Sequence, residues 1–323
     1  MEIIPFREEF LNDAATLFVR NYHEQRHAVP VLPEGMENVL SVAEMLNELF
    51  QTCPGVAVVE NGELTAYMGW DIVEHFRNAD ITGAYVPVWA HSAAGKNSAA
   101  LYRGMYRTAS GYWATRGCGV HAISLLASDR SAEKTWFWNG FGLAVVDAIR
   151  PILPVDAKLA ENLVVRKAQI QDFAAIDVLD REHVRHYSEA PIFMAAIPPE
   201  SPDASRAILS GPVDSIWLAE FQDEPAGFMS FERRGHGTTK IVESETTIAI
   251  TNAYTRPQYR GKGIAAAVLD AGLQHYRQLG FERCSVDFES INPEAVNFWM
   301  KYFEPVCFSL MRHPEALQQV KIV

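Results

Sequence analysis

The sequence contains the same hairpin pattern twice, about 161 residues apart. In residues 55–70, two apolar runs flank Asn61-Gly62, a pair typical of a tight hairpin turn. Residues 216–231 repeat the pattern of the two apolar runs. A repeat at about half the chain length predicts two similar domains, because each half is long enough to bury its own core.

The elements around the two hairpins also repeat. Short strands are expected at residues 1–6 and 163–167, each followed by a helix, at residues 10–21 and 171–183. Each half closes on an aromatic cluster followed by an apolar strand. This order predicts a mixed α/β layer architecture and not an all-parallel doubly wound sheet. The alternative is that two unrelated α/β domains share the rhythm by chance.

The boundary between the domains is expected in residues 151–162. Pro151 and Pro154 lie in this segment with several charged residues, and prolines interrupt regular structure. We therefore place the domains at residues 1–152 and 160–323.

Composition narrows the classes of function. The 323 residues include 28 Lys and Arg against 40 Asp and Glu, a formal charge of −12, which argues against a nucleic-acid-binding protein. No uncharged apolar run approaches the roughly 20 residues that cross a bilayer, and the first residues do not resemble a signal peptide. The four cysteines have no CxxC spacing, which argues against a zinc cluster or a disulfide framework. We expect a reduced cytoplasmic protein without membrane or nucleic-acid partners.

The segment 246–280 carries the most specific chemistry. A β-rich run leads to Pro257, and a turn with Gly261 and Gly263 then opens an amphipathic helix that ends near Gly280. The glycines let the backbone approach a ligand closely, and the first helical N–H groups and the helix dipole attract an anion. With the charges of Arg260 and Lys262, this turn predicts a pyrophosphate cradle. It matches neither a P-loop nor GxGxxG, and the alternative is an ordinary glycine-containing surface loop.

This segment resembles the acetyl-CoA motif of the GCN5-related N-acetyltransferase (GNAT) superfamily, Arg/Gln-x-x-Gly-x-Gly/Ala after a strand and opening a helix. Arg260-Gly-Lys-Gly263-Ile-Ala265 matches it. Residues 291–306 resemble the closing segment of the family and match it at Asn292, Ala295, Phe298 and Phe303. The resemblance covers residues 163–323. It implies two tandem GNAT-like domains, each with a mixed, mostly antiparallel central sheet flanked by helices.

The resemblance also implies a reaction. An acetyl group would move from acetyl-CoA to a primary amine of a small molecule or peptide, by direct attack in a ternary complex and without a metal. Backbone groups on the fourth strand would bind pantetheine, the cradle would hold the pyrophosphate, and residues of the closing segment would contact the cofactor arm. The implied cofactor-binding residues are Ala253, Thr255, Arg260, Gly261, Lys262, Gly263, Ile264, Ala265, Asn292 and Phe298.

The sequence departs from the family where a tyrosine often protonates the leaving thiolate. Trp299 stands there, and an indole N–H is no proton donor at a useful pKa. Tyr302, one helical turn away, and Tyr254, on the fourth strand, are the candidate acids. The alternative for both is a packed core aromatic.

The candidate bases are Glu245 and Glu289, near the fourth and fifth strands. The amine must lose a proton, and a buried carboxylate with a raised pKa accepts it through water. The alternative is a solvated edge carboxylate. His183 and His186 are either part of the acceptor pocket or surface residues, and Glu189 is a possible partner for a cationic acceptor.

In the N-terminal half, Ser92 replaces the arginine and Ala93 the first glycine of the cradle, while Gly95 and Lys96 remain. We expect a degenerate copy that completes a pseudo-dimer, although binding of CoA by both halves stays open. A non-catalytic acyl-CoA-binding or regulatory module is the alternative function. The identity of the acceptor and the choice between monomer and homodimer also stay open.

Overall fold

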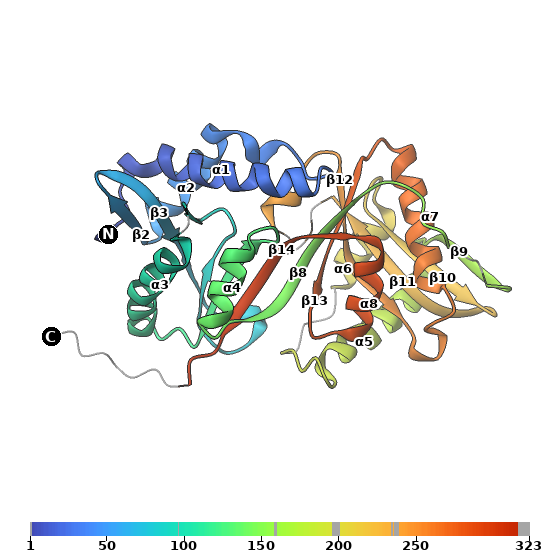
Figure 1. Cartoon of the computed structure of the whole chain (residues 1–323). Coiled ribbons are helices and arrows are strands. Elements are labelled where there is room, and N and C mark those ends of the chain that lie inside the picture. The colour runs from blue at the N-terminus through green and yellow to red at the C-terminus, as the bar shows by residue number, and fades with distance from the viewer. Residues whose placement is uncertain are drawn as a thin grey trace. The chain divides into compact units, whose positions relative to one another are not determined.

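The computed structural model describes residues 2–95, 97–157, 160–195, 201–233, 235 and 239–315. The chain divides into two compact units, which Figure 1 shows in blue to green and in yellow to red for most of their length. Unit 1 is Met1–Val146 with Pro305–Val323, and unit 2 is Asp147–Glu304. Both contain β-sheet flanked by helices, which confirms the predicted mixed α/β class.

Unit 1 holds two groups of paired strands. One group has the order β1-β2-β3-β6 and is antiparallel throughout. The other pairs β4 with β5, β5 with β7 and β7 with β14, and only the β5–β7 pair is parallel. The strands are β1 Glu2–Pro5, β2 Gly55–Glu60, β3 Glu63–Gly69, β4 Asp71–Val73, β5 Gly83–Val86, β6 His91–Ala93, β7 Val120–Leu126 and β14 Glu304–Arg312. The helices are α1 Leu11–Ala28, α2 Val39–Thr52, α3 Ser98–Thr115 and α4 Arg130–Trp138.

The last strand of the described residues, β14, pairs with β7 of unit 1. β14 runs antiparallel to β7, from Cys307 opposite Leu126 to Arg312 opposite His121. Strand β8, Gly142–Pro151, begins in unit 1 and ends in unit 2. The described residues 305–315, which the sequence prediction assigned to the second domain, therefore group with the compact unit of the first.

Unit 2 holds the strand order β9-β10-β11-β12-β13. Its pairs are antiparallel except for β12 with β13, which are parallel. The strands are β9 Leu163–Lys167, β10 Ser215–Phe221, β11 Glu224–Glu232, β12 Thr247–Thr255 and β13 Arg283–Glu289. The helices are α5 Phe173–Ser188, α6 Pro202–Ser210, α7 Ile264–Gln278 and α8 Pro293–Tyr302.

Both predicted hairpins are confirmed. β2 and β3 turn at Asn61 and Gly62, and β10 and β11 turn at Gln222 and Asp223, all four with positive φ. Two consecutive residues of positive φ are what a type I′ turn needs.

The helices predicted at 10–21 and 171–183 are present, but both continue beyond the predicted ends, because the residues that follow remain compatible with a helix. Pro151 does not begin a linker. It is the last residue of β8, and residues 152–157 and 160–162 after it form neither helix nor strand.

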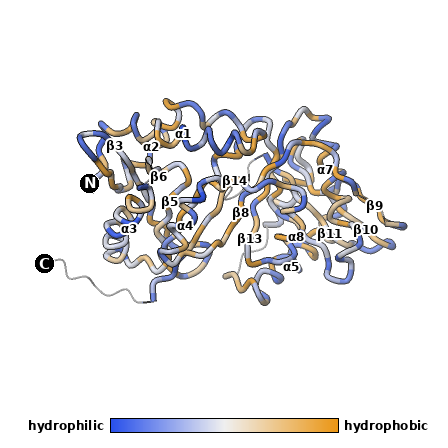
Figure 2. Tube along the Cα trace, in the orientation of Figure 1, coloured by the Kyte–Doolittle hydropathy of each residue, from blue (hydrophilic) through white to orange (hydrophobic). Residues whose placement is uncertain are grey.

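Helices cover both faces of the unit 2 sheet. On one face, Ile176 and Leu179 of α5 pack with Phe228 and Tyr254 of the sheet. On the other face, α7 approaches β11 so closely that a Cβ at Gly272 would lie 2.4 Å from the Phe231 ring, so any larger residue there would force the ring to move. Figure 2 shows the hydrophobic stretches of the strands between these helices. Helices α5 and α7 therefore pack against opposite faces of this sheet.

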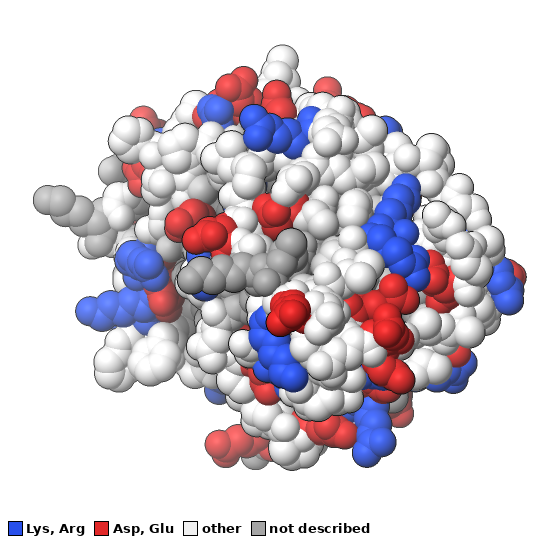
Figure 3. All heavy atoms as spheres, turned by 90° about the vertical axis from the view of Figure 1, so that its right-hand side faces the viewer, with Lys and Arg blue, Asp and Glu red and all other residues white. Residues whose placement is uncertain are grey.

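Among the described residues, no helix combines the length and the apolar character that a bilayer crossing requires. Figure 3 shows acidic and basic side chains interspersed on one face of the molecule.

Candidate active site

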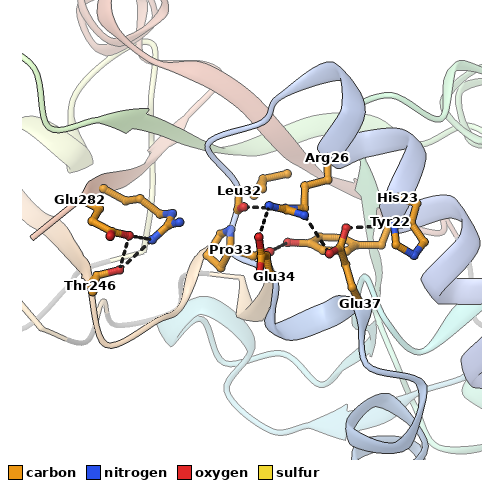
Figure 4. Close-up of polar contacts among 10 residues, drawn as sticks. Tyr22, His23, Arg26, Leu32, Pro33, Glu34, Glu37, Thr246 and Glu282 are labelled. Atoms are coloured by element: carbon orange, nitrogen blue, oxygen red, sulfur yellow. Dashed lines mark hydrogen bonds and ion pairs between the residues drawn. The ribbon is translucent and has the colours of Figure 1, made fainter.

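Strands β12 and β13 are paired at one end and separate at the other. Their parallel pairing runs from Thr247 and Arg283 to Ile250 and Val286, whereas β12 stays paired with β11 as far as Thr255. At the paired end, Thr246 accepts backbone hydrogen bonds from Glu282 and Arg283, of 2.9 and 3.1 Å. The Arg283 guanidinium also donates to the Thr246 hydroxyl at 2.7 Å, a cluster drawn in Figure 4. The last five residues of β12 therefore have one edge open toward β13.

A cavity of about 570 Å³ lies at the open end. Its walls come from β11, β12, β13, α5, the start of α7, and α8. Residues from all of these elements lie in unit 2. The separated ends of β12 and β13 and the cavity between them therefore both lie within unit 2.

The backbone of β12 alternates between β11 and the cavity. Arg256 N donates to Ala226 O at 2.9 Å, so residues 252, 254 and 256 direct their backbone groups to β11. Ala253 and Thr255, between them, direct their N–H and C=O groups toward the open side. The Thr255 carbonyl accepts from Arg260 Nε at 3.1 Å. Ala253 thus offers a backbone donor and acceptor to a ligand lying along the strand.

A glycine turn joins β12 to α7. Gly261 and Gly263 have φ of +76° and +79°, values that L side chains rarely adopt, so glycine is favoured at both positions. Gly263 is the N-cap of α7, and no side chain caps the helix there. The first N–H groups of α7 therefore face the cavity, which Gly261, Gly263, Ile264 and Ala265 all line. Uncapped N–H groups and the positive end of the helix dipole together suit an anion.

The two cations of the turn point in different directions. Arg260 lines the cavity, and its Nη1 lies 2.9 Å from Oε1 of Glu294. Lys262 is not a lining residue. Its Nζ lies 4.9 Å from the ring centroid of Phe221 and 5.5 Å from that of Tyr259. The structure therefore brings the predicted cradle residues together, except for the side chain of Lys262.

Helix α8 forms the opposite wall. Asn292 is its N-cap and is buried, and its side-chain oxygen accepts from Ala295 N at 3.2 Å. Phe298, Trp299 and Tyr302 follow along the helix, and all three line the cavity. The Asn292 carbonyl oxygen is thus already used in capping α8, while Phe298 is placed to pack against a ligand.

Both candidate acids line the cavity. Tyr254 is 9% exposed. Burial, followed by the negative charge of Glu182, raises the pKa of its hydroxyl, so Tyr254 keeps its proton at neutral pH. Tyr302 lies on α8, with its ring centroid 5.1 Å from that of Phe298. The two hydroxyls come from opposite walls of one cavity.

Neither candidate base lines the cavity. Glu245 is exposed in the turn before β12, at the end of the strand opposite to the cradle. Glu289 is the last residue of β13 and is half-buried. The carboxylates that do line the cavity are Asp287 and Glu294. Sequence reasoning missed Glu294, whose only signal was its place in the acidic first turn of a helix that follows the Asn292 cap.

Helix α5 supplies a third wall through His183, His186 and Tyr187. His183 is 6% exposed. Burial, followed by the electrostatic effect of His186, lowers its pKa to about 4, so the imidazole is neutral at pH 7. Burial also lowers the pKa of His186. Glu189 is hydrogen-bonded to Arg185 at 3.0 Å and does not line the cavity.

The part of the chain that the structure describes contains no group of three or more His, Cys, Asp or Glu residues placed to hold a metal ion.

In the corresponding region of unit 1, a histidine joins the strands and a helix by hydrogen bonds. His91 on β6 bonds the Ser124 carbonyl on β7 at 2.8 Å through Nε2, and its Nδ1 lies 3.1 Å from the Tyr102 hydroxyl. Ser92 and Ala93 lie within β6 and not in a turn. Gly95 has a positive φ, but Lys96 lies outside the described residues. We therefore retain the prediction that this half is a degenerate copy.

Comparisons with known proteins agree with this geometry. Residues 182–303 match the model of the acetyltransferase (GNAT) family. A curated relative is an uncharacterized N-acetyltransferase, YjgM, of Escherichia coli K12. It is 25% identical over 152 residues, which are 46% of this chain and 87% of the relative.

Two solved structures share the fold. A GCN5-related N-acetyltransferase from Sphaerobacter thermophilus aligns over 97% of each chain, with a TM-score of 0.61 and 14% identity. A GCN5-related glucosamine N-acetyltransferase region of a fungal multi-domain β-N-acetylglucosaminidase aligns over 96% of this chain and 38% of that one, with a TM-score of 0.55 and 10% identity.

Proposed function

Because the chain is a member of the GNAT superfamily, we propose that unit 2 transfers an acetyl group from acetyl-CoA to a primary amine of a small molecule or peptide. One observation carries the proposal. The open edge of β12 and the uncapped N-terminus of α7 meet at a single cavity, so a ligand with an amide-bearing arm and a phosphate end can engage both.

The described residues suit acetyl-CoA at this cavity. Ala253 offers its backbone N–H and C=O to the amides of pantetheine. The N–H groups after Gly263 and the guanidinium of Arg260 would hold the pyrophosphate. Phe298 would pack beside the arm. When bound, acetyl-CoA supplies an activated thioester and a thiolate leaving group.

The protein's own residues would then move protons during direct attack in a ternary complex. Asp287 is the carboxylate on β13 that lines the cavity, and it would accept the proton of the amine through water. Tyr302 lies on α8, one turn from Trp299, and would protonate the thiolate. Glu245 and Glu289 lie outside the cavity and have no part in this scheme.

The acceptor is proposed to enter from the side of α5, where the walls are aromatic. The proposal that the protein works in the cytoplasm is supported by its four cysteines, none of which forms a disulfide bond, with Cys118, Cys284 and Cys307 buried.

Calorimetric titration with acetyl-CoA and a thiol-release assay with a panel of amines test the function. We expect one cofactor per chain, lower affinity in Arg260→Ala, and amine-dependent release of thiol. Lys240→Ala is the matched control, because this exposed lysine lies before β12 and outside the cavity.

Binding without amine-dependent thiol release would instead support a non-catalytic acyl-CoA-binding module, an alternative favoured by Trp299 in place of the family tyrosine. Failure to bind at millimolar concentration would overturn both functions.

A further inference from the structure

One wall of the cavity is aromatic. His183, His186 and Tyr187 of α5 lie against Phe228 of β11 and Tyr254 of β12, and all five line the cavity. The ring centroid of His183 lies 4.9 Å from that of Tyr187, 5.9 Å from Tyr254 and 6.1 Å from Phe228. We call these five residues the aromatic wall. Aromatic pairs prefer edge-to-face or offset geometry, so a ligand ring bound at this wall would gain contacts of the same kind.

The aromatic wall carries no net charge at neutral pH. Burial is the largest cause that lowers the pKa of both histidines, so the imidazoles are neutral. The nearby carboxylates of α5 are paired with arginines. Glu182 accepts two hydrogen bonds from Arg256, at 2.9 and 2.8 Å, and Glu189 pairs with Arg185. A second or third ammonium group of an acceptor would therefore meet no uncompensated acid of α5.

His183 has hydrogen-bonding capacity that the described residues do not use. Its Nδ1 is buried and has no hydrogen-bond partner among them. A buried polar atom without a partner is unfavourable unless a ligand or water completes its hydrogen bonding. His183 also lies at the centre of the aromatic wall, in contact range of three of its rings. The wall thus combines aromatic rings with a neutral imidazole whose Nδ1 has no hydrogen-bond partner among the described residues.

From these observations we infer that the acceptor is a monoamine whose amine is carried on an aromatic ring, and that a hydrogen-bonding group on this ring pairs with His183. This inference rests on the proposed function, since the ring would bind on the α5 side while its amine faces the open edge of β12. It excludes polyamines as the preferred acceptors, despite the formal charge of −12 of the whole chain.

Binding to the complex with CoA tests the class of acceptor without any need for turnover. Calorimetry of the full chain saturated with CoA would compare 2-phenylethylamine, n-hexylamine and spermidine. We expect the dissociation constant of 2-phenylethylamine to be at least tenfold lower than that of either other amine. Equal or tighter binding of n-hexylamine or spermidine, or no binding of 2-phenylethylamine, would overturn the inference. Saturation with CoA is measured first, so loss of the cofactor site is distinguished from a wrong acceptor class.

Two variants test the wall itself. Tyr187→Leu should raise the dissociation constant of 2-phenylethylamine at least fivefold and leave that of n-hexylamine unchanged. Tyr112→Leu, at a tyrosine of α3 that is 38% exposed, is the control and should change neither value. An equal loss for both amines in Tyr187→Leu would mean that the tyrosine supports the fold and does not recognise a ring.

The role of His183 is tested with a pair of amines that differ by one hydroxyl. Wild type should bind tyramine at least fivefold more tightly than 2-phenylethylamine. His183→Phe keeps a ring but removes both nitrogens, so it should abolish this preference, while His183→Asn, which keeps a polar atom near the position of Nδ1, should retain part of it. An unchanged preference in His183→Phe would remove His183 from the site.

Discussion

The Nη1 atom of Arg260 lies 2.9 Å from the Oε1 atom of Glu294, so an ion pair joins the glycine turn to the first turn of α8. Both side chains line the cavity, and the Arg260 side chain is 28% exposed. The pair holds the guanidinium at the cavity before any ligand is present. A phosphate would therefore compete with the Glu294 carboxylate for Arg260, and the two residues should affect cofactor affinity in opposite directions.

Arg260→Ala should weaken acetyl-CoA binding by about 1–3 kcal/mol, the range of a hydrogen bond to a charged group. Glu294→Gln should strengthen binding a few-fold, because it removes the competing carboxylate and keeps the side-chain shape. Calorimetric titration of both variants measures these changes, and Lys240→Ala should match wild type. An unchanged affinity in Arg260→Ala would show that the pyrophosphate binds elsewhere.

Tyr302→Phe and Tyr254→Phe should have different kinetic effects. Tyr302 lies on α8 beside Phe298, where we place the cofactor, so its loss should lower kcat at least tenfold with little change in the KM for acetyl-CoA. Tyr254 lies beside His183 and His186, so its loss should mainly raise the KM for the amine. Steady-state kinetics at varied amine and acetyl-CoA would separate the two effects. The reverse pattern would exchange the roles of the two tyrosines.

The sequence predicted the glycine turn well because its signals are local. Positive φ at Gly261 and Gly263, and the start of α7 immediately after them, depend on neighbouring residues only. The direction of Lys262 was not predictable in this way. Its Nζ lies over the Phe221 ring on β10, a residue far away in the sequence.

Other differences arise from long-range pairing. Glu245 was placed near the reaction because it precedes the fourth strand, but β12 continues through Thr255, so its two ends are about 26 Å apart at roughly 3.3 Å per residue. The pairing of β14 with β7 joins residues about 185 apart, as in the Ser124–Ser309 hydrogen bond of 2.7 Å. No local pattern in the sequence specifies such a pair.

His183 should make the stability of the protein depend on pH. Its pKa is about 4 in the folded chain and about 6.5 when unfolded, so between these values only the unfolded state binds the proton. The free energy of unfolding therefore falls as the pH drops from 6.5 toward 4, and the contribution of His183 to this loss is about 2 kcal/mol at pH 5. Urea denaturation at pH 7 and pH 5 measures the loss in wild type and in His183→Phe.

The variant should lose less stability than wild type over this interval. The comparison is needed because His121 in unit 1 also has a pKa of about 4 and contributes to both proteins. An identical pH dependence in wild type and His183→Phe would show that His183 is solvated in the folded state.

Arg26 should stabilise the loop between α1 and α2 at neutral pH. Its guanidinium donates to the Leu32 carbonyl at 2.9 Å, to Glu37 at 2.8 Å and to Glu34 at 2.9 Å, as Figure 4 shows. The hydrogen bond from Arg26 lowers the pKa of Glu37 below 4.5, so this part of the stabilisation is present above that pH and is lost as the pH falls through the folded pKa. Arg26→Met should destabilise unit 1 by about 1–2 kcal/mol at pH 7 and by less at pH 3.

Hydrogen exchange in residues 28–39 would locate the effect of Arg26→Met. Glu34→Gln is the control and should cost less than about 0.5 kcal/mol, because the Glu34 side chain is 76% exposed. Equal protection of this loop in Arg26→Met and wild type at pH 7 would contradict the prediction.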